Sequence, residues 1–142
     1  MSGIIIAILS GVMMSVQGVF NTGVTKQTSI WTAATFVQLT ALIVSIGAWF
    51  VAGGQAPFSS LFRIEGKYML LGGVIGIAIT WTVIQSVAKL GPAKSAMLIV
   101  TSQLLAAYLI ELFGLFGMEK AEFRIRKLVA MVLVIGGILL FQ

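Results

Sequence analysis

Side-chain amides are the polar groups that recur inside the long apolar segments of this sequence. Each of the first four apolar segments contains one glutamine, and Asn21 follows Gln17 by about one helical turn. Amides donate and accept hydrogen bonds without exchanging protons, so they suit recognition of a polar solute better than acid–base catalysis. The four glutamines are Gln17, Gln38, Gln85 and Gln103. In hydrocarbon each amide needs a partner, which is either a neighbouring helix or a solute in a shared polar cavity.

Catalytic and metal-binding side chains are scarce. The sequence has no histidine and no cysteine, which excludes a histidine base, a thiol nucleophile and the usual zinc ligands. No apolar segment carries a pair of carboxylates for general acid–base work. We therefore predict that the protein is not an enzyme, that it has no catalytic residues and that it needs no metal or other cofactor.

Glu111 is the one carboxylate within an apolar segment. An acid inside a membrane span indicates function by default, and here it would carry a coupling proton. The residue lies about 12 Å from the middle of its helix, near the membrane surface. An interfacial salt bridge with a loop lysine or arginine is the alternative interpretation, and both remain open from the sequence.

The composition identifies the class of protein. Of 142 residues, 59% are hydrophobic and 9% are charged, whereas soluble domains carry about 25% charged residues. The chain is therefore predicted to be an all-α, polytopic membrane protein in contact with the lipid bilayer. The net charge of +5 comes from lysines and arginines scattered among apolar runs. This distribution favours loop charges that orient a membrane protein over a nucleic-acid interface.

The apolar segments predict five transmembrane helices, because about 20 residues of helix cross the hydrocarbon core. Together they form a single domain over residues 1–142. The predicted spans are residues 3–22, 30–52, 68–88, 93–116 and 123–141. The last apolar run is short, and it spans only if the helix begins near Phe123 and the basic residues that follow snorkel to the surface.

Lysines and arginines set the expected orientation. Six fall in loops on the N-terminal side: Arg63, Lys67, Lys120, Arg124, Arg126 and Lys127. Three fall on the other side: Lys26, Lys89 and Lys94. This bias favours a cytoplasmic N-terminus if the topology is fixed, although it is modest enough to leave dual insertion open.

Small residues within the spans predict close helix packing. They recur at helical spacing in the first and third spans, and as a pair in the last. The positions that we assign to packing are Gly11, Gly72, Gly76, Gly136 and Gly137.

Several short motifs follow one another in a characteristic order. They are Gln17-x-x-x-Asn21, Gly72-Gly73-x-x-Gly76, Leu90-Gly91-Pro92-Ala93, Ser102-Gln103-Leu104, Phe113-Gly114-Leu115-Phe116-Gly117 and Gly136-Gly137. In this order the chain resembles, over nearly its whole length, the YdcZ-type family of the drug/metabolite transporter superfamily. It differs from the usual pattern at Ser102, where the family has glycine, and at Glu111, where aspartate is frequent.

The resemblance implies a fold and an activity. Larger members of the superfamily have ten spans in two inverted halves, and a five-span chain resembles one half. Because the span count is odd, two copies must pair in opposite orientations to reproduce the ten-span fold. The implied assembly is an antiparallel homodimer, or a heterodimer with a paralogue, in the bacterial inner membrane. The implied activity is transport of a small molecule, with export as the expected direction.

Depth in the membrane selects the residues expected to meet a solute at the dimer interface. A two-fold axis in the membrane plane brings together residues that lie near the middle of their spans. Gln103 lies at the middle of its span, and Gln38 and Trp81 each lie roughly 4–5 Å from the middle of theirs. Gln17 is about 7 Å from the middle. The Trp81 ring either packs in the core or stacks on a planar or cationic solute. We predict that Gln17, Asn21, Gln38, Trp81 and Gln103 line the path of a small polar or amphipathic solute.

Two other functions fit the same sequence. An antiparallel pair could form an ion channel, which would show single-channel conductance where a transporter would show counterflow. A non-transporting subunit would instead co-purify with an unrelated protein and show no flux alone.

Overall fold

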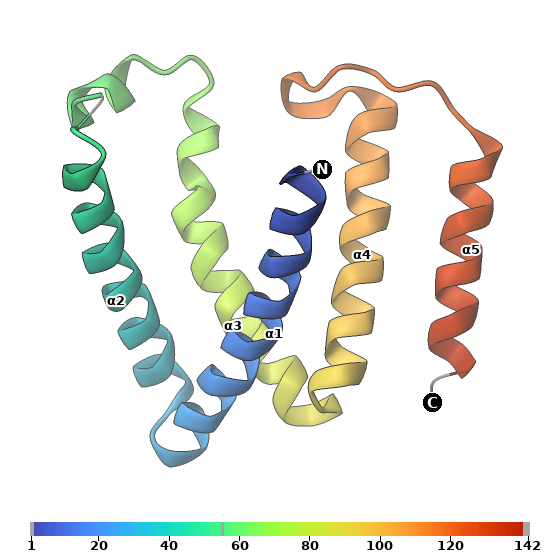
Figure 1. Ribbon diagram of the computed structural model, residues 1–142, viewed down its shortest axis with the longest axis horizontal. Helices are drawn as coiled ribbons and strands as arrows, with labels where there is room; N and C mark the ends of the chain where they lie inside the picture. The colour runs from blue at the N-terminus through green and yellow to red at the C-terminus, as the bar shows by residue number, and fades with distance from the viewer. Residues whose placement is uncertain (1, 55, 141–142) are drawn as a thin grey trace. The chain divides into compact units, whose positions relative to one another are not determined.

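A computed structural model of the chain describes residues 2–54 and 56–140. Every regular element within these residues is helical, with five α-helices and three short 3-10 helices. The prediction of an all-α fold is therefore confirmed, and Figure 1 shows the helices in chain order. The chain forms two compact units, residues 1–88 and 89–142.

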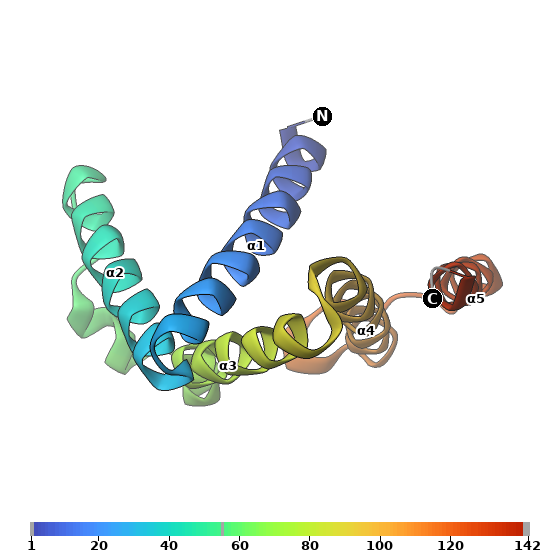
Figure 2. The same ribbon diagram turned by 90° about the horizontal axis from the view of Figure 1, so that it is seen from below.

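The first unit begins with two long helices, α1 (Ser2–Gln27) and α2 (Ile30–Val51). They meet at a short turn and diverge as they leave it (Figures 1 and 2). This divergence leaves the facing sides of the two helices open to each other away from the turn.

Side chains at the turn define both helix ends. The first helix continues beyond Thr22, where its apolar run ends, because polar side chains satisfy its last carbonyls. The Thr28 hydroxyl donates to the Val24 carbonyl at 2.8 Å. Ser29 then caps α2, since its side-chain oxygen accepts a hydrogen bond from the Thr32 backbone N–H at 3.1 Å.

Glycines in left-handed conformation end α2. Gly53 and Gly54 have φ values of 79° and 57°, a backbone conformation that glycine adopts more readily than other residues. Two 3-10 helices, η1 (Phe58–Arg63) and η2 (Lys67–Leu71), then lead into α3 (Gly72–Leu90).

Small residues form much of the buried part of the first unit. Gly18 of α1 and Ala33 and Ala34 of α2 are buried, together with Ile84 of α3. A Cβ atom on Gly18 would lie 3.3 Å from Cγ1 of Val83, so the α1 backbone approaches α3 closely here. The close approach is possible because glycine has no side chain at the contact.

A single residue, Gly91, separates α3 from α4 (Pro92–Phe113). Gly91 has a φ of 80°, and Pro92 lies in the first turn of α4, where its missing N–H leaves no hydrogen bond unmade. The fourth helix ends at Phe113, before the predicted limit of the span at residue 116. The reason is Gly114, which adopts the left-handed conformation that terminates helices, with φ of 64°.

In the second unit α4 lies antiparallel beside α5 (Ile125–Leu140) (Figure 1). A third 3-10 helix, η3 (Leu115–Gly117), begins the connection between them. The connection folds back on α4, because the Ala121 backbone N–H donates to the Glu111 carbonyl at 2.8 Å. The fifth helix begins two residues after Phe123, and Phe141, the last residue of the predicted span, lies outside the described residues.

Four helical segments within the described residues are long and apolar enough to cross a membrane. They are α1, α2, α4 and the continuous segment Lys67–Leu90 formed by η2 and α3. The fifth helix has 16 residues, or roughly 24 Å of rise. Only 6% of the most apolar stretch of each of the four segments is buried within the chain. Most of their side chains therefore face lipid or another chain.

Candidate functional site

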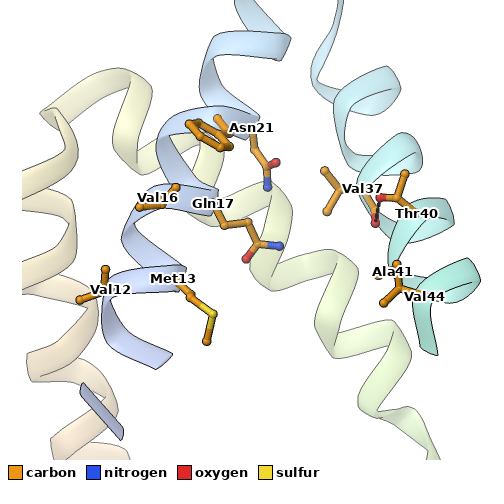
Figure 3. A pocket seen from close by; sticks show the side chains of 10 residues that line it. Val12, Met13, Val16, Gln17, Asn21, Val37, Thr40, Ala41 and Val44 are labelled. Carbon is orange, nitrogen blue, oxygen red and sulfur yellow. Dashed lines mark hydrogen bonds between the residues drawn. The ribbon is translucent and has the colours of Figure 1, made fainter. Parts of the chain in front are cut away.

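An open pocket of about 540 Å³ lies between α1 and α2 (Figure 3). Its walls are mostly aliphatic and carry polar groups at two positions on α1 and one on α2. The lining residues are Val12, Met13, Val16, Gln17, Phe20 and Asn21 from α1, with Val37, Thr40, Ala41 and Val44 from α2. The pocket thus combines an apolar surface with a few hydrogen-bonding groups, as small-molecule sites commonly do.

Two amides of α1 point into this pocket. Gln17 and Asn21 are four residues apart, so helical geometry places them on one face, and both side chains are directed toward the space between α1 and α2 (Figure 3). The Gln17 side chain is exposed, whereas Asn21 is only 7% exposed. Neither side-chain amide forms a hydrogen bond with another described residue. Their donors and acceptors are therefore available to a solute or to water.

The buried position of Asn21 gives this arrangement its significance. The Asn21 amide atoms are not among the fully buried polar atoms that lack a partner, so they remain open to the pocket. In a membrane the surrounding hydrocarbon offers them no hydrogen bond. A polar ligand in the pocket would supply the missing hydrogen bonds.

Thr40 provides the polar group on α2. Its hydroxyl donates to the backbone carbonyls of Phe36 and Val37, each at 3.0 Å. The hydroxyl hydrogen is therefore used within the helix, and the oxygen remains able to accept a hydrogen bond from a ligand. Sequence reasoning missed Thr40, because α2 is apolar on all sides and its sequence does not show which face lines the pocket.

Gln38 lies elsewhere on α2. Its side chain is half-buried, and its Nε2 atom lies 3.7 Å from the position that a Cβ on Gly76 of α3 would occupy. The amide therefore packs against α3 and does not line the pocket with Gln17 and Asn21. This contact resembles the interhelical packing role considered for the glutamines.

Trp81 and Gln103 also lie outside the pocket. Trp81 is on α3 with 37% of its surface exposed, and Gln103 is an exposed residue of α4 in the second unit. The structure thus brings together Gln17 and Asn21 among the five predicted path residues. The other three lie outside the pocket: Gln38 on α2, Trp81 on α3 and Gln103 on α4.

Glu111 forms an ion pair in the second unit. Its Oε2 atom lies 3.0 Å from Nζ of Lys127, and both side chains are 45% exposed. The interfacial salt bridge considered from the sequence is therefore present, with a lysine from the first turn of α5.

The predicted packing glycines differ in their surroundings. Gly76 lies against Gln38, whereas nothing lies within 4 Å of a Cβ built on Gly11, Gly72, Gly136 or Gly137. These four open positions are available to contact another chain. Gly18, which the sequence analysis did not select, has the tightest interhelical contact of the helical glycines in the described residues.

Comparison with known proteins supplies the family. A sequence model of the family described as "Putative inner membrane exporter, YdcZ" matches residues 2–140. The chain belongs to this family. No curated protein and no solved structure matches it.

Membership in the YdcZ family confirms the resemblance seen in the motifs. The family description and the four helical segments that are long and apolar enough to cross a membrane identify a multi-pass protein of the inner membrane. The family description supports a role in membrane transport rather than in catalysis.

Proposed function

We propose that this protein exports a small polar or amphipathic solute across the inner membrane and that the pocket between α1 and α2 holds the solute. The observation that carries the proposal is Asn21, a mostly buried residue whose amide opens onto the pocket and has no hydrogen-bond partner among the described residues, in a family of inner membrane exporters. The solute would bond to Asn21 and Gln17 and donate to Thr40, with its apolar part against the aliphatic wall.

We further propose that the working unit is an antiparallel dimer, either of two copies or with a paralogue, with five spans in each chain. Low burial of the spans supports this assembly, because most of their surface is free to contact a second chain. Gln103 supports it more specifically. Its exposed amide at mid-span has no hydrogen-bond partner in the described part of the chain, and lipid would leave it unsatisfied.

In this assembly Gln38, Trp81 and Gln103 would line the solute path near the membrane midplane, reached by alternating access. Glu111 would lie toward a mouth of the path. There it would carry a coupling proton, and a proton on its carboxylate would weaken the ion pair with Lys127.

Inverted membrane vesicles allow a test in which the solute is identified by the experiment itself. Vesicles containing the protein would be incubated with a mixture of polar metabolites, and their contents measured by mass spectrometry. We expect at least one solute to accumulate in wild-type vesicles and not in vesicles with Asn21→Leu, which removes the amide at similar volume.

The matched control is Gln27→Leu, which removes an amide at the end of α1 outside the pocket. This variant should accumulate the solute as the wild type does. The proposal is wrong if no solute distinguishes wild-type vesicles from vesicles lacking the protein, or if Asn21→Leu accumulates the solute normally.

A further inference from the structure

Two side chains of α4 hold the ammonium group of Lys127. Its Nζ atom lies 3.0 Å from Oε2 of Glu111 and 5.2 Å from the centroid of the Tyr108 ring. Tyr108 and Glu111 are three residues apart and therefore share one face of the helix. A carboxylate beside an aromatic face is a combination that binds ammonium ions through charge and through the ring quadrupole.

A cavity of about 240 Å³ adjoins this group between α4 and α5. Besides the three residues above, its walls are apolar, formed by Leu104, Ala107, Ala130 and Met131. The polar side chains thus lie at one part of the cavity, and the rest of the cavity could accommodate the hydrocarbon part of a ligand. Tyr108 is only 7% exposed, so its ring is a fixed wall rather than a mobile surface group.

We propose that Tyr108 and Glu111 form a binding site for the ammonium head of a small amphipathic amine, and that Lys127 occupies this site as an internal competitor. The apolar tail of the amine would lie against the aliphatic wall of the cavity. Lysine is suited to such exchange, because its flexible stem lets the ammonium move to the membrane surface. The proposal concerns the second unit alone and does not depend on the solute pocket between α1 and α2.

Binding of an amine would also change the contact between the two helices. The Glu111–Lys127 pair joins the last turn of α4 to the first turn of α5. An amine that replaces Lys127 would break this connection. The site would therefore couple occupancy by an amine to release of the start of α5 from α4.

Calorimetric titration with hexylammonium tests the site directly, using the full-length protein in nanodiscs of phosphatidylglycerol. Lys127→Met removes the internal competitor and should bind hexylammonium at least about tenfold more tightly than the wild type. Adding Glu111→Gln to this variant should weaken binding about tenfold or more, and adding Tyr108→Leu should weaken it severalfold. Hexanol, which has the same tail without the charge, should show no saturable binding beyond its partition into protein-free nanodiscs.

Arg126→Met is the matched control, since it removes one positive charge from an exposed neighbouring position. An equal gain in affinity from this variant would show that surface charge alone is responsible and would overturn the proposal. Absence of saturable binding to folded Lys127→Met would also overturn it. Lys127→Gln provides a second variant should the methionine protein not fold.

The amine could be a free solute or the ethanolamine head group of a lipid. Nanodiscs that also contain phosphatidylethanolamine distinguish the two sources in the Lys127→Met protein. Competition by the lipid should lower the apparent affinity for hexylammonium, whereas unchanged affinity identifies a free amine as the ligand.

Discussion

Gly18 of α1 faces Val83 of α3 so closely that a Cβ atom on Gly18 would lie 3.3 Å from the valine Cγ1. The same atom would lie 3.6 Å from Cγ2 of Val87. Gly18 follows the pocket residue Gln17 directly, so the part of α1 that packs on α3 adjoins the part that presents the amides. We predict that Gly18→Leu destabilises the protein by about 1–3 kcal/mol, because the larger side chain overpacks the contact.

Denaturation of the purified protein would measure this effect. Gly23→Leu is the control, since it places the same side chain on the same helix where nothing lies within 4 Å of the new Cβ. Equal loss of stability in the two variants would contradict a specific contact between Gly18 and α3.

The ion pair between Glu111 and Lys127 should contribute a small, measurable coupling energy. A double-mutant cycle with Glu111→Gln and Lys127→Met is expected to give about 0.2–1 kcal/mol, as partly exposed pairs do. The pair between Glu122 and Arg124 is the comparison, because its atoms are 4.0 Å apart and its side chains are 86% and 70% exposed. We expect its cycle to give a coupling energy near zero. A Glu111–Lys127 coupling no larger than this would show that the pair does not join α4 to α5.

Gln103→Leu should abolish transport while the dimer persists. The Gln103 amide has no hydrogen-bond partner among the described residues, so its loss should leave the fold of the chain unchanged. Transport would be measured in vesicles and dimerisation by cross-linking. Normal transport by this variant, judged against Gln27→Leu, would mean that Gln103 does not recognise the solute.

Membrane orientation is testable because the chain contains no native cysteine. A single cysteine would replace Gln142, which lies outside the described residues, and intact cells would be labelled with a membrane-impermeant thiol reagent. If the dimer consists of two copies of this chain, about half of the protein should react, because one chain that forms an antiparallel homodimer inserts in both orientations. Nearly complete labelling would instead indicate a fixed orientation and an oppositely oriented partner.

The sequence specified helix ends more fully than helix faces. Gly91 and Pro92 marked the boundary between α3 and α4 because each has a strong conformational preference. In contrast, the pocket face of α2 contains Val37, Thr40 and Val44, whereas the predicted solute-facing residue was Gln38. A membrane helix is apolar all around, so its sequence lacks the amphipathic pattern that would reveal its rotation.

Glu111 illustrates the same limit for the site. The sequence marked it as an unusual acid within an apolar segment, but its partner Lys127 is 16 residues away on the next helix. Folding of the loop between α4 and α5 decides which basic residue reaches it. The Gln17 and Asn21 pair was predictable, in contrast, because both residues lie on one helix and four-residue spacing aligns them.

Counterflow with the purified protein is the most direct test of solute transport by this chain. Proteoliposomes loaded with a high concentration of the solute identified in vesicles would be diluted into medium containing the labelled solute. We predict transient uptake of label against its gradient, absent with Asn21→Leu. Flux with unitary conductance and no counterflow would indicate a channel, and absence of flux would indicate a subunit without transport activity of its own; either result would contradict the proposed exporter.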